Sequence, residues 1–263
     1  MYQTIQIEDR ELVRHIVLNR PEFKNAMNEV MIQELADCFK KLPQTVRVVV
    51  LKGSGDFYCA GGDLNWMKSS VEKSVEENRE DALKLGKMLR FVNECPIPVM
   101  SIVKGGAFGG GVGLVAASDI VIADERAKFS LSEVKLGLIP ATIGPIVMRK
   151  IGISQARRLY LTGLRFTSQE AKAMGLVHES VPASSILSVT NEYLREFESS
   201  GPEAVRTAKS LIFRLQSGSL WNEDISESTS ELLSKVRVGD EAQEGISAFL
   251  EKRQAKWRHK LLP

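Results

Sequence analysis

Short runs rich in valine and isoleucine alternate with amphipathic segments over the first two thirds of the chain. The runs with strand character cover residues 5–7, 12–18, 46–52, 98–103 and 119–123. Residues 28–42 and 71–93 instead place apolar side chains at helical spacing, which predicts two helices. Strands that alternate with helices indicate an α/β core.

The strand signal fades after about residue 182. Helical patterns follow over residues 186–197, 202–216, 226–238 and 243–256. Pro202 comes directly after Gly201, and proline is favoured in the first turn of a helix. The sequence therefore predicts two parts, an α/β core over residues 1–195 and a helical C-terminal region over residues 196–263.

Composition and charge narrow the class of protein. The chain has 263 residues, of which 43% are apolar and 26% are charged, as is ordinary for a globular protein. Its 35 basic and 33 acidic residues are interspersed and give a net charge of +2, so nucleic acid is not an expected partner. The three cysteines and three histidines are dispersed, which predicts neither a disulfide framework nor a metal site.

The location expected from the sequence is the cytoplasm. The first twenty residues contain no apolar signal core and carry acidic residues early. No apolar run approaches the ~20 residues of a membrane-spanning helix. The sparse cysteines agree with a reducing compartment.

Two glycine-rich segments could bind a developing negative charge. The first contains Gly61 and Gly62 and is followed by Asp63, which is expected to cap the next helix rather than act as an acid. The second, over residues 104–114, holds six glycines in nine residues between a strand and an apolar helix. Free N–H groups at such a helix start favour negative charge. The alternatives are a plain capped turn and a tightly packed joint between strand and helix.

A third segment contains Glu133 between apolar neighbours. This carboxylate is either a desolvated general base with a raised pKa or a surface residue beside Lys135. Taken together, the three segments supply two possible oxyanion donors and one carboxylate, without a nucleophile and histidine pair. These groups suit catalysis on a thioester, because the donors can polarise its carbonyl while the carboxylate moves a proton at the neighbouring carbon.

These segments, in their order and spacing, resemble the crotonase (enoyl-CoA hydratase/isomerase) superfamily. The matching motifs are A-G-G-D-L, F-G-G-G-V-G-L and S-E-V-K-L-G-L-I-P, with further matches near residues 18–27, 156–163, 170–177 and 244–253. The resemblance covers nearly the whole chain. It implies a spiral of ββα units whose helical C-terminal region drives assembly into a trimer or a dimer of trimers. It also implies a coenzyme A thioester substrate, with no metal or redox cofactor and no membrane partner.

The resemblance assigns roles to particular positions. The oxyanion N–H groups would belong to Gly62 and Gly110, and the catalytic acid would be Glu133. The substrate would contact the following residues: Glu22, Phe23 and Lys24 at the adenine end of CoA, Ala60, Asp63 and Leu64 at the oxyanion turn, then Lys68, Gly113 and Lys252. Trp66 is expected either in the acyl pocket or in the core.

One position departs from the two-acid pattern of the hydratases. The first acid would stand at position 113, where this chain has Gly113, so that Glu133 would act alone. Related Δ3,Δ2-enoyl-CoA isomerases also work with a single acid at the position of Glu133. Isomerisation is therefore an alternative to hydration.

A finer resemblance favours hydration. Residues 59–68 and 132–143 look like bacterial methylglutaconyl-CoA hydratases of leucine degradation, many of which lack the first acid. The distal carboxylate of that substrate would need a cation, for which Lys68 is the candidate. A fatty-acid substrate is the other expectation within hydration. A non-catalytic CoA-binding or RNA-binding role is the third hypothesis.

Overall fold

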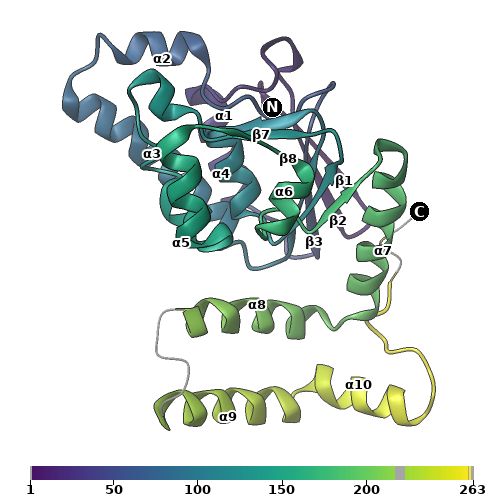
Figure 1. Cartoon of the computed structure of the whole chain (residues 1–263). Coiled ribbons are helices and arrows are strands. Elements are labelled where there is room, and N and C mark those ends of the chain that lie inside the picture. Colours follow the sequence, from purple (N-terminus) through teal and green to yellow (C-terminus); the bar gives the residue numbers. More distant parts are fainter. Residues whose placement is uncertain (1, 217–222, 260, 262–263) are drawn as a thin grey trace.

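A six-stranded sheet forms the centre of the protein. The computed structural model describes residues 2–216, 223–259 and 261. The strand order is β1 (Ile5–Arg10), β2 (Val13–Leu18), β3 (Val48–Gly53), β4 (Val99–Val103), β6 (Ile120–Asp124) and β9 (Glu179–Val181). β1 and β2 pair antiparallel, and every later neighbour is parallel (Figure 1). The predicted α/β core is confirmed.

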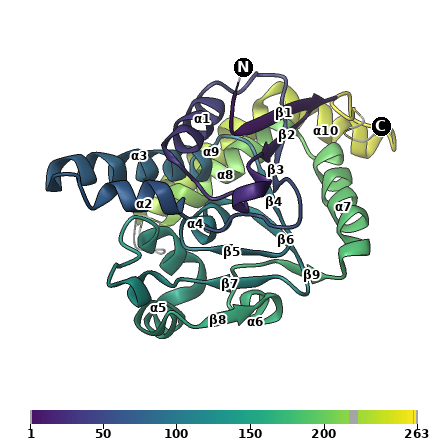
Figure 2. The ribbon, with the colours of Figure 1, turned by 90° about the horizontal axis from the view of Figure 1, so that it is seen from above.

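Helices cover both faces of this sheet. α1 (Glu29–Lys40), α3 (Val75–Asn93) and α4 (Gly110–Ala117) lie on one face, and α7 (Ile186–Ser199) lies on the other (Figure 2). Neighbouring residues of β3 therefore pack into different clusters, Val49 and Leu51 into the first and Val48 and Val50 into the second. A parallel strand buried on both faces is apolar throughout, which explains the unbroken run in the sequence.

A second, smaller sheet lies beside the first. It consists of β5 (Gly106–Phe108), β7 (Lys128–Ser130) and β8 (Arg165–Thr167). The rings of Phe129 and Phe166 stack across β7 and β8 with centroids 5.6 Å apart. The sequence did not predict these strands, because three residues are too few to establish an alternating pattern. β5 leads directly into the glycine-rich start of α4.

The predicted helix over residues 71–93 is confirmed as α3, except that it starts four residues later, at Val75. A separate short helix, α2 (Leu64–Ser70), ends just before this segment. Ser74 accepts a hydrogen bond from the N–H of Glu77, whose side chain bonds back to the N–H of Ser74. This reciprocal cap sets the start of α3.

Further helices lie between and after the strands of the small sheet and continue toward the end of the chain. They are α5 (Gly144–Thr162), α6 (Ser168–Ala173), α8 (Pro202–Gln216), α9 (Glu223–Val238) and α10 (Asp240–Leu250), with short 3₁₀ turns η1 (Pro21–Phe23), η2 (Glu133–Leu136) and η3 (Ala183–Ser185). The predicted helix over 243–256 is wrong beyond Leu250, because the chain turns there and Lys252 adopts φ 54°. No helix of the described ranges is long and apolar enough to cross a membrane.

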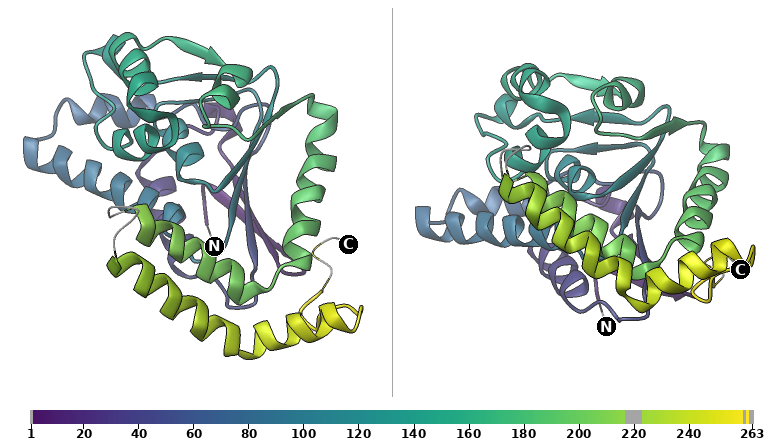
Figure 3. Two further views of the ribbon diagram at one scale, coloured as in Figure 1. Left: turned by 60° about the horizontal axis from the view of Figure 1, so that its bottom comes forward. Right: turned by 90° about the horizontal axis from the view of Figure 1, so that it is seen from below.

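α8, α9 and α10 form a separate layer below the sheet (Figure 3). One buried side chain ties this layer to the core. Nζ of Lys209 in α8 donates to the carbonyl of Ile97 at 3.0 Å and to Oδ2 of Asp119 at 2.6 Å. A cavity of about 660 Å³ lies within the layer, between α8 and α10.

Candidate active site

A cavity of about 640 Å³ opens where the two glycine-rich turns meet η1 and η2. It brings together segments that are far apart in the sequence. The lining residues are Glu22, Phe23, Lys24, Ala26, Ala60, Gly61, Gly62, Asp63, Leu64, Asn65, Met67, Phe108, Gly109, Gly110, Ser132, Glu133, Leu136 and Leu138. All three segments with predicted chemistry therefore reach one cavity.

The first glycine turn is held by backbone pairing with Met27. The N–H of Met27 donates to the carbonyl of Gly61 at 2.7 Å, and the N–H of Asp63 donates to the carbonyl of Met27 at 2.9 Å. The N–H of Gly62 lies between these two bonds and, within the described residues, has no acceptor. Gly61 has φ 94°, a conformation that favours glycine. The turn thus presents one free donor to the cavity.

The second glycine turn supplies another free donor. Gly110 is the first residue of α4, and Gly109 before it has φ 47°. The N–H of Gly110 has no acceptor within the described residues, as expected at the start of a helix. A Cβ on Gly61 would lie 2.8 Å from the carbonyl oxygen of Phe108, so the two turns touch backbone to backbone. Two unsatisfied N–H groups on adjacent rigid turns are suited to hold an oxyanion.

Glu133 is the first residue of η2 and faces these turns. Its Oε1 lies 3.2 Å from the point that a Cβ on Gly109 would occupy. Its Oε2 is buried and has no hydrogen-bond partner in the structure. Burial raises the pKa of Glu133, because desolvation disfavours the ionised carboxylate more than its one backbone hydrogen bond favours it. A buried carboxylate with a free oxygen is poised to take up a proton.

We expect Glu133→Gln to change the pH dependence of stability. Because the pKa of Glu133 is raised on folding, its contribution to stability is fully present below the unfolded pKa of about 4.5 and is lost as pH rises through the folded pKa. Glutamine does not titrate. The free energy of unfolding of the variant, relative to wild type, should therefore rise between about pH 4 and pH 7, as measured by urea denaturation. A flat or falling difference would contradict a raised pKa.

Asp63 is a buried helix cap. One of its oxygens accepts hydrogen bonds from the N–H groups of Asn65 at 2.8 Å and Trp66 at 3.2 Å, and the other pairs with Arg20 at 2.9 Å. Burial raises the pKa of Asp63, but these hydrogen bonds and the Arg20 cation outweigh it and leave the pKa below its ordinary value. The cap prediction is confirmed, and the carboxylate is held ionised. No signal in the sequence pointed to Arg20, since Arg20 and Asp63 meet only in the fold.

Six of the nine predicted substrate contacts line the cavity, and three do not. Those that line it are Glu22, Phe23, Lys24, Ala60, Asp63 and Leu64. Lys68 is exposed in α2 outside the lining, and Lys252 is exposed after α10. Trp66 packs partly buried against the core instead of lining the cavity. Met67, Leu136 and Leu138 line it without having been predicted, because only the fold brings α2 and η2 to opposite sides.

Gly113 is buried inside α4 and does not line the cavity. A Cβ at this position would lie 2.7 Å from Cγ2 of Ile143 and 3.3 Å from Cδ1 of Leu89. Both distances are shorter than ordinary van der Waals contact. The space in which the resemblance places a first acid is therefore filled by apolar side chains in this chain.

The described residues offer no alternative metal or thiol chemistry at this site. No three His, Cys, Asp or Glu side chains gather there or elsewhere in the described ranges in a way that could hold a metal ion. Cys59 is buried behind the first turn, and burial raises its pKa to about 12. It is therefore a small core residue and not a nucleophile.

Comparison with known proteins agrees with this geometry. Residues 8–260 match the family model described as enoyl-CoA hydratase/isomerase. A crystal structure of an enoyl-CoA hydratase from Shewanella pealeana superposes with a TM-score of 0.92 at 36% identity, over 97% of this chain and 96% of that one.

Two further relatives carry different activity names. An enoyl-CoA isomerase/hydratase of Mycosarcoma maydis is 35% identical, over 76% of each chain. A hydroxycinnamoyl-CoA hydratase-lyase of Pseudomonas fluorescens is 33% identical, over 79% of this chain and 77% of its own. The match to the family model spans nearly the whole sequence and includes both glycine turns and Glu133. This chain is a member of the enoyl-CoA hydratase/isomerase family, with its crotonase fold.

Proposed function

We propose that this protein adds water across the double bond of a short 2-enoyl-CoA thioester. The observation that carries the proposal is the buried, unpartnered carboxylate of Glu133 in the same cavity as the free N–H groups of Gly62 and Gly110. Two donors can hold the thioester oxygen while one carboxylate moves the proton.

The proposed reaction needs only these groups and water. Glu133 takes a proton from water as the hydroxyl oxygen bonds to C3 of the substrate. The electron pair of the double bond moves toward the thioester oxygen, where Gly62 and Gly110 stabilise the enolate. Glu133 then returns its proton to C2, which restores the carboxylate and the carbonyl. We propose no cofactor beyond the CoA carried by the substrate.

Isomerisation of a 3-enoyl-CoA is the second candidate. It is favoured by the apolar contacts of Ile143 and Leu89 around Gly113, which leave Glu133 without a second acid to hold water. A single carboxylate can remove a proton from C2 to give a dienolate, held by the same two N–H groups, and return the proton to C4. A non-catalytic CoA-binding or RNA-binding role fits less well, since it gives no reason to bury an unpaired carboxylate.

The cavity favours an uncharged acyl group. Lys24, the residue after η1, is the one lysine or arginine among its described lining residues, and the resemblance assigns this segment to the adenine end. Leu64, Met67, Leu136 and Leu138 supply apolar side chains. A methylglutaconyl group would bring a second carboxylate to these walls. Lys68, the cation suggested for it, lies outside the lining.

We therefore expect crotonyl-CoA to be the better substrate. Its product should gain the mass of one water, and kcat/KM should exceed that for 3-methylglutaconyl-CoA by about tenfold or more, since an unpaired charge costs at least ~1.4 kcal/mol here. Mass spectrometry of the products with both substrates and a 3-enoyl-CoA tests this. An unchanged mass with a shifted double bond would identify an isomerase. A preference for methylglutaconyl-CoA that Lys68→Ala abolishes would restore the finer assignment.

We also propose self-association through the helical layer and a cytoplasmic location. Val238, Phe249 and Leu250, on α9 and α10, expose 72–83% of their surface, and exposed apolar side chains that lie together are typical of a protein interface. A trimer, or a dimer of trimers, would cover them, and light scattering of the purified protein measures that mass. Three buried free cysteines are compatible with a reducing compartment.

A further inference from the structure

Helix α2 forms one wall of the cavity, but its side chains pack only weakly against the rest of the protein. It has seven residues, none of them fully buried. A helix this short is not stable on its own. Leu64, Asn65 and Met67 of α2 nevertheless line the cavity, and the oxyanion donor Gly62 precedes it by two residues. The position of this wall must therefore be fixed from the ends of the helix.

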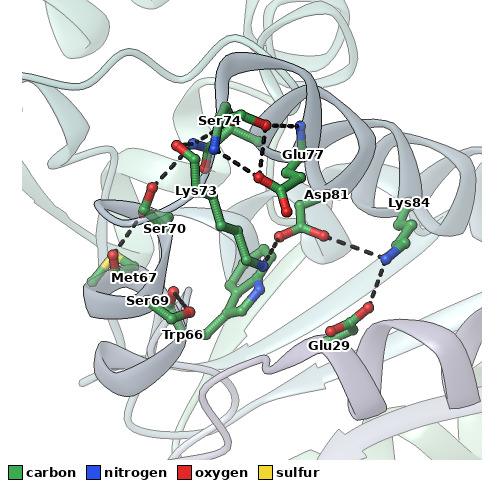
Figure 4. A network of polar contacts seen from close by, with 11 residues as sticks. Glu29, Trp66, Met67, Ser69, Ser70, Lys73, Ser74, Glu77, Asp81 and Lys84 are labelled. Atoms are coloured by element: carbon green, nitrogen blue, oxygen red, sulfur yellow. Dashed lines mark hydrogen bonds and ion pairs between the residues drawn. The ribbon is translucent and has the colours of Figure 1, made fainter.

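The Asp63 cap described above fixes the first end, and a polar cluster holds the second. The side-chain amide of Asn78 donates to the carbonyls of Ser70 and Lys73 at 3.0 and 3.2 Å. Nζ of Lys73 pairs with Oδ2 of Asp81 in α3 at 2.5 Å. Figure 4 shows Lys73 reaching Asp81.

Asp81 extends this cluster to α1. Its other oxygen, Oδ1, lies 3.4 Å from Nζ of Lys84, which pairs with Glu29 at 2.6 Å. Glu29 is the first residue of α1, two residues after Met27, whose backbone pairs with the first glycine turn. The Asp63 cap, these ion pairs and the backbone bonds of Met27 therefore link four elements in a closed ring: the first glycine turn, α2, α3 and α1.

Asp81 is the buried link in this ring. It is 7% exposed, and the hydrogen bond from Lys73 lowers its pKa by more than burial raises it. Removing its charge would leave Lys73 and Lys84 without their shared counter-ion. The indole of Trp66 points toward the Lys73–Asp81 pair (Figure 4). A Cβ on Gly62 would lie 3.9 Å from this ring. A shift of the cluster would thus be passed to the oxyanion donor.

We propose that Asp81 is a positioning residue: it holds the turn after α2 against α3 through Lys73, takes part in the link from α3 to α1 through Lys84 and Glu29, and so fixes the N–H of Gly62 in the cavity. The effect on turnover rests on the proposed function, whereas the effect on the position of α2 does not. Catalytic geometry tolerates little displacement, and about 1 Å of misplacement can cost up to ~100-fold in rate.

The test is Asp81→Asn in the full-length protein, with two readouts. Hydrogen exchange of the amides over residues 62–72 should become faster, while exchange in β6 stays as in wild type. With crotonyl-CoA, kcat should fall about tenfold or more and KM should change less, because the loss lies in the transition state. Glu76→Gln is the matched control, since it breaks an exposed pair with Arg79 on the same helix. Asp81→Glu should recover part of kcat.

The outcomes separate this proposal from the proposed function. Faster exchange over 62–72 together with a lower kcat supports it. Unchanged exchange there, or an unchanged kcat in an active enzyme, overturns it. If wild type turns over no enoyl-CoA, the proposed function fails, and the exchange measurement still decides the role of Asp81. If Asp81→Asn does not fold, Glu29→Gln, at the exposed end of the ring, must give the same two changes in weaker form.

Discussion

Glu133→Gln should lower kcat by about 10³-fold, within the 10²–10⁴-fold range of general acid–base catalysis. The variant keeps the size and polarity of the side chain but cannot take up the proton. Glu133 is the cavity-lining carboxylate with a buried, unpartnered oxygen, and Asp63 is held ionised by its cap bonds and Arg20. The third acid of the described lining, Glu22, is exposed in η1, at the end of the cavity that the resemblance assigns to adenine. Glu133 is therefore the acid placed to move the proton. Steady-state kinetics with crotonyl-CoA measures the loss.

Binding of CoA separates a lost proton carrier from a damaged cavity. The Kd for free CoA, measured by calorimetry, should stay within about twofold of wild type, because η1 and the glycine turns are unchanged. Glu125→Gln, which alters an exposed carboxylate just after β6, serves as the control and should retain full activity. Wild-type turnover by Glu133→Gln would show that another group moves the proton, and it would contradict both proposed reactions.

Gly113→Glu should destabilise the protein by about 3 kcal/mol or more and should not produce a two-acid hydratase. The new Cβ alone would lie 2.7 Å from Cγ2 of Ile143, and the carboxylate would be buried among apolar side chains. Overpacking typically costs about 1–3 kcal/mol, and an unpaired buried carboxylate adds to that. Urea denaturation, read from the shift in midpoint at constant slope, measures the effect.

A double-mutant cycle tests whether Ile143 is the cause. Gly113→Ala alone should be destabilising. The same change should cost less in the Ile143→Ala background, so that the double variant loses less stability than the sum of the two single variants. Gly137→Ala is the backbone control, since Gly137 has φ 72° but nothing within 4 Å of its Cβ position. The free energy of unfolding of Gly137→Ala should fall only by the cost of holding alanine in the left-handed conformation, about 1 kcal/mol. A Gly113→Glu variant that is as stable as wild type and hydrates faster would show that Ile143 and Leu89 move aside to admit the new side chain.

Local signals in the sequence identified much of the candidate site. The paired glycines at 61–62 and the triplet at 109–111 marked the two turns, because Gly61 and Gly109 adopt positive φ angles that favour glycine. The Asp63 cap could be predicted for the same reason, as a side chain bonding to N–H groups two and three residues away. The apolar neighbours of Glu133 made it a candidate carboxylate, and the family resemblance assigned it the role of the catalytic acid.

The walls of the cavity and the partners of its charges depend on the tertiary structure. Local patterns were enough for the glycine turns and the Asp63 cap, since those interactions span a few residues. Other contacts join segments with no local relation, so no pattern in the sequence predicts them: Arg20 with Asp63, Ile143 with Gly113, and Lys84 with Glu29. Lys68 shows the converse: its place near the oxyanion turn suggested a ligand, but the direction in which α2 leaves that turn puts it outside the cavity lining.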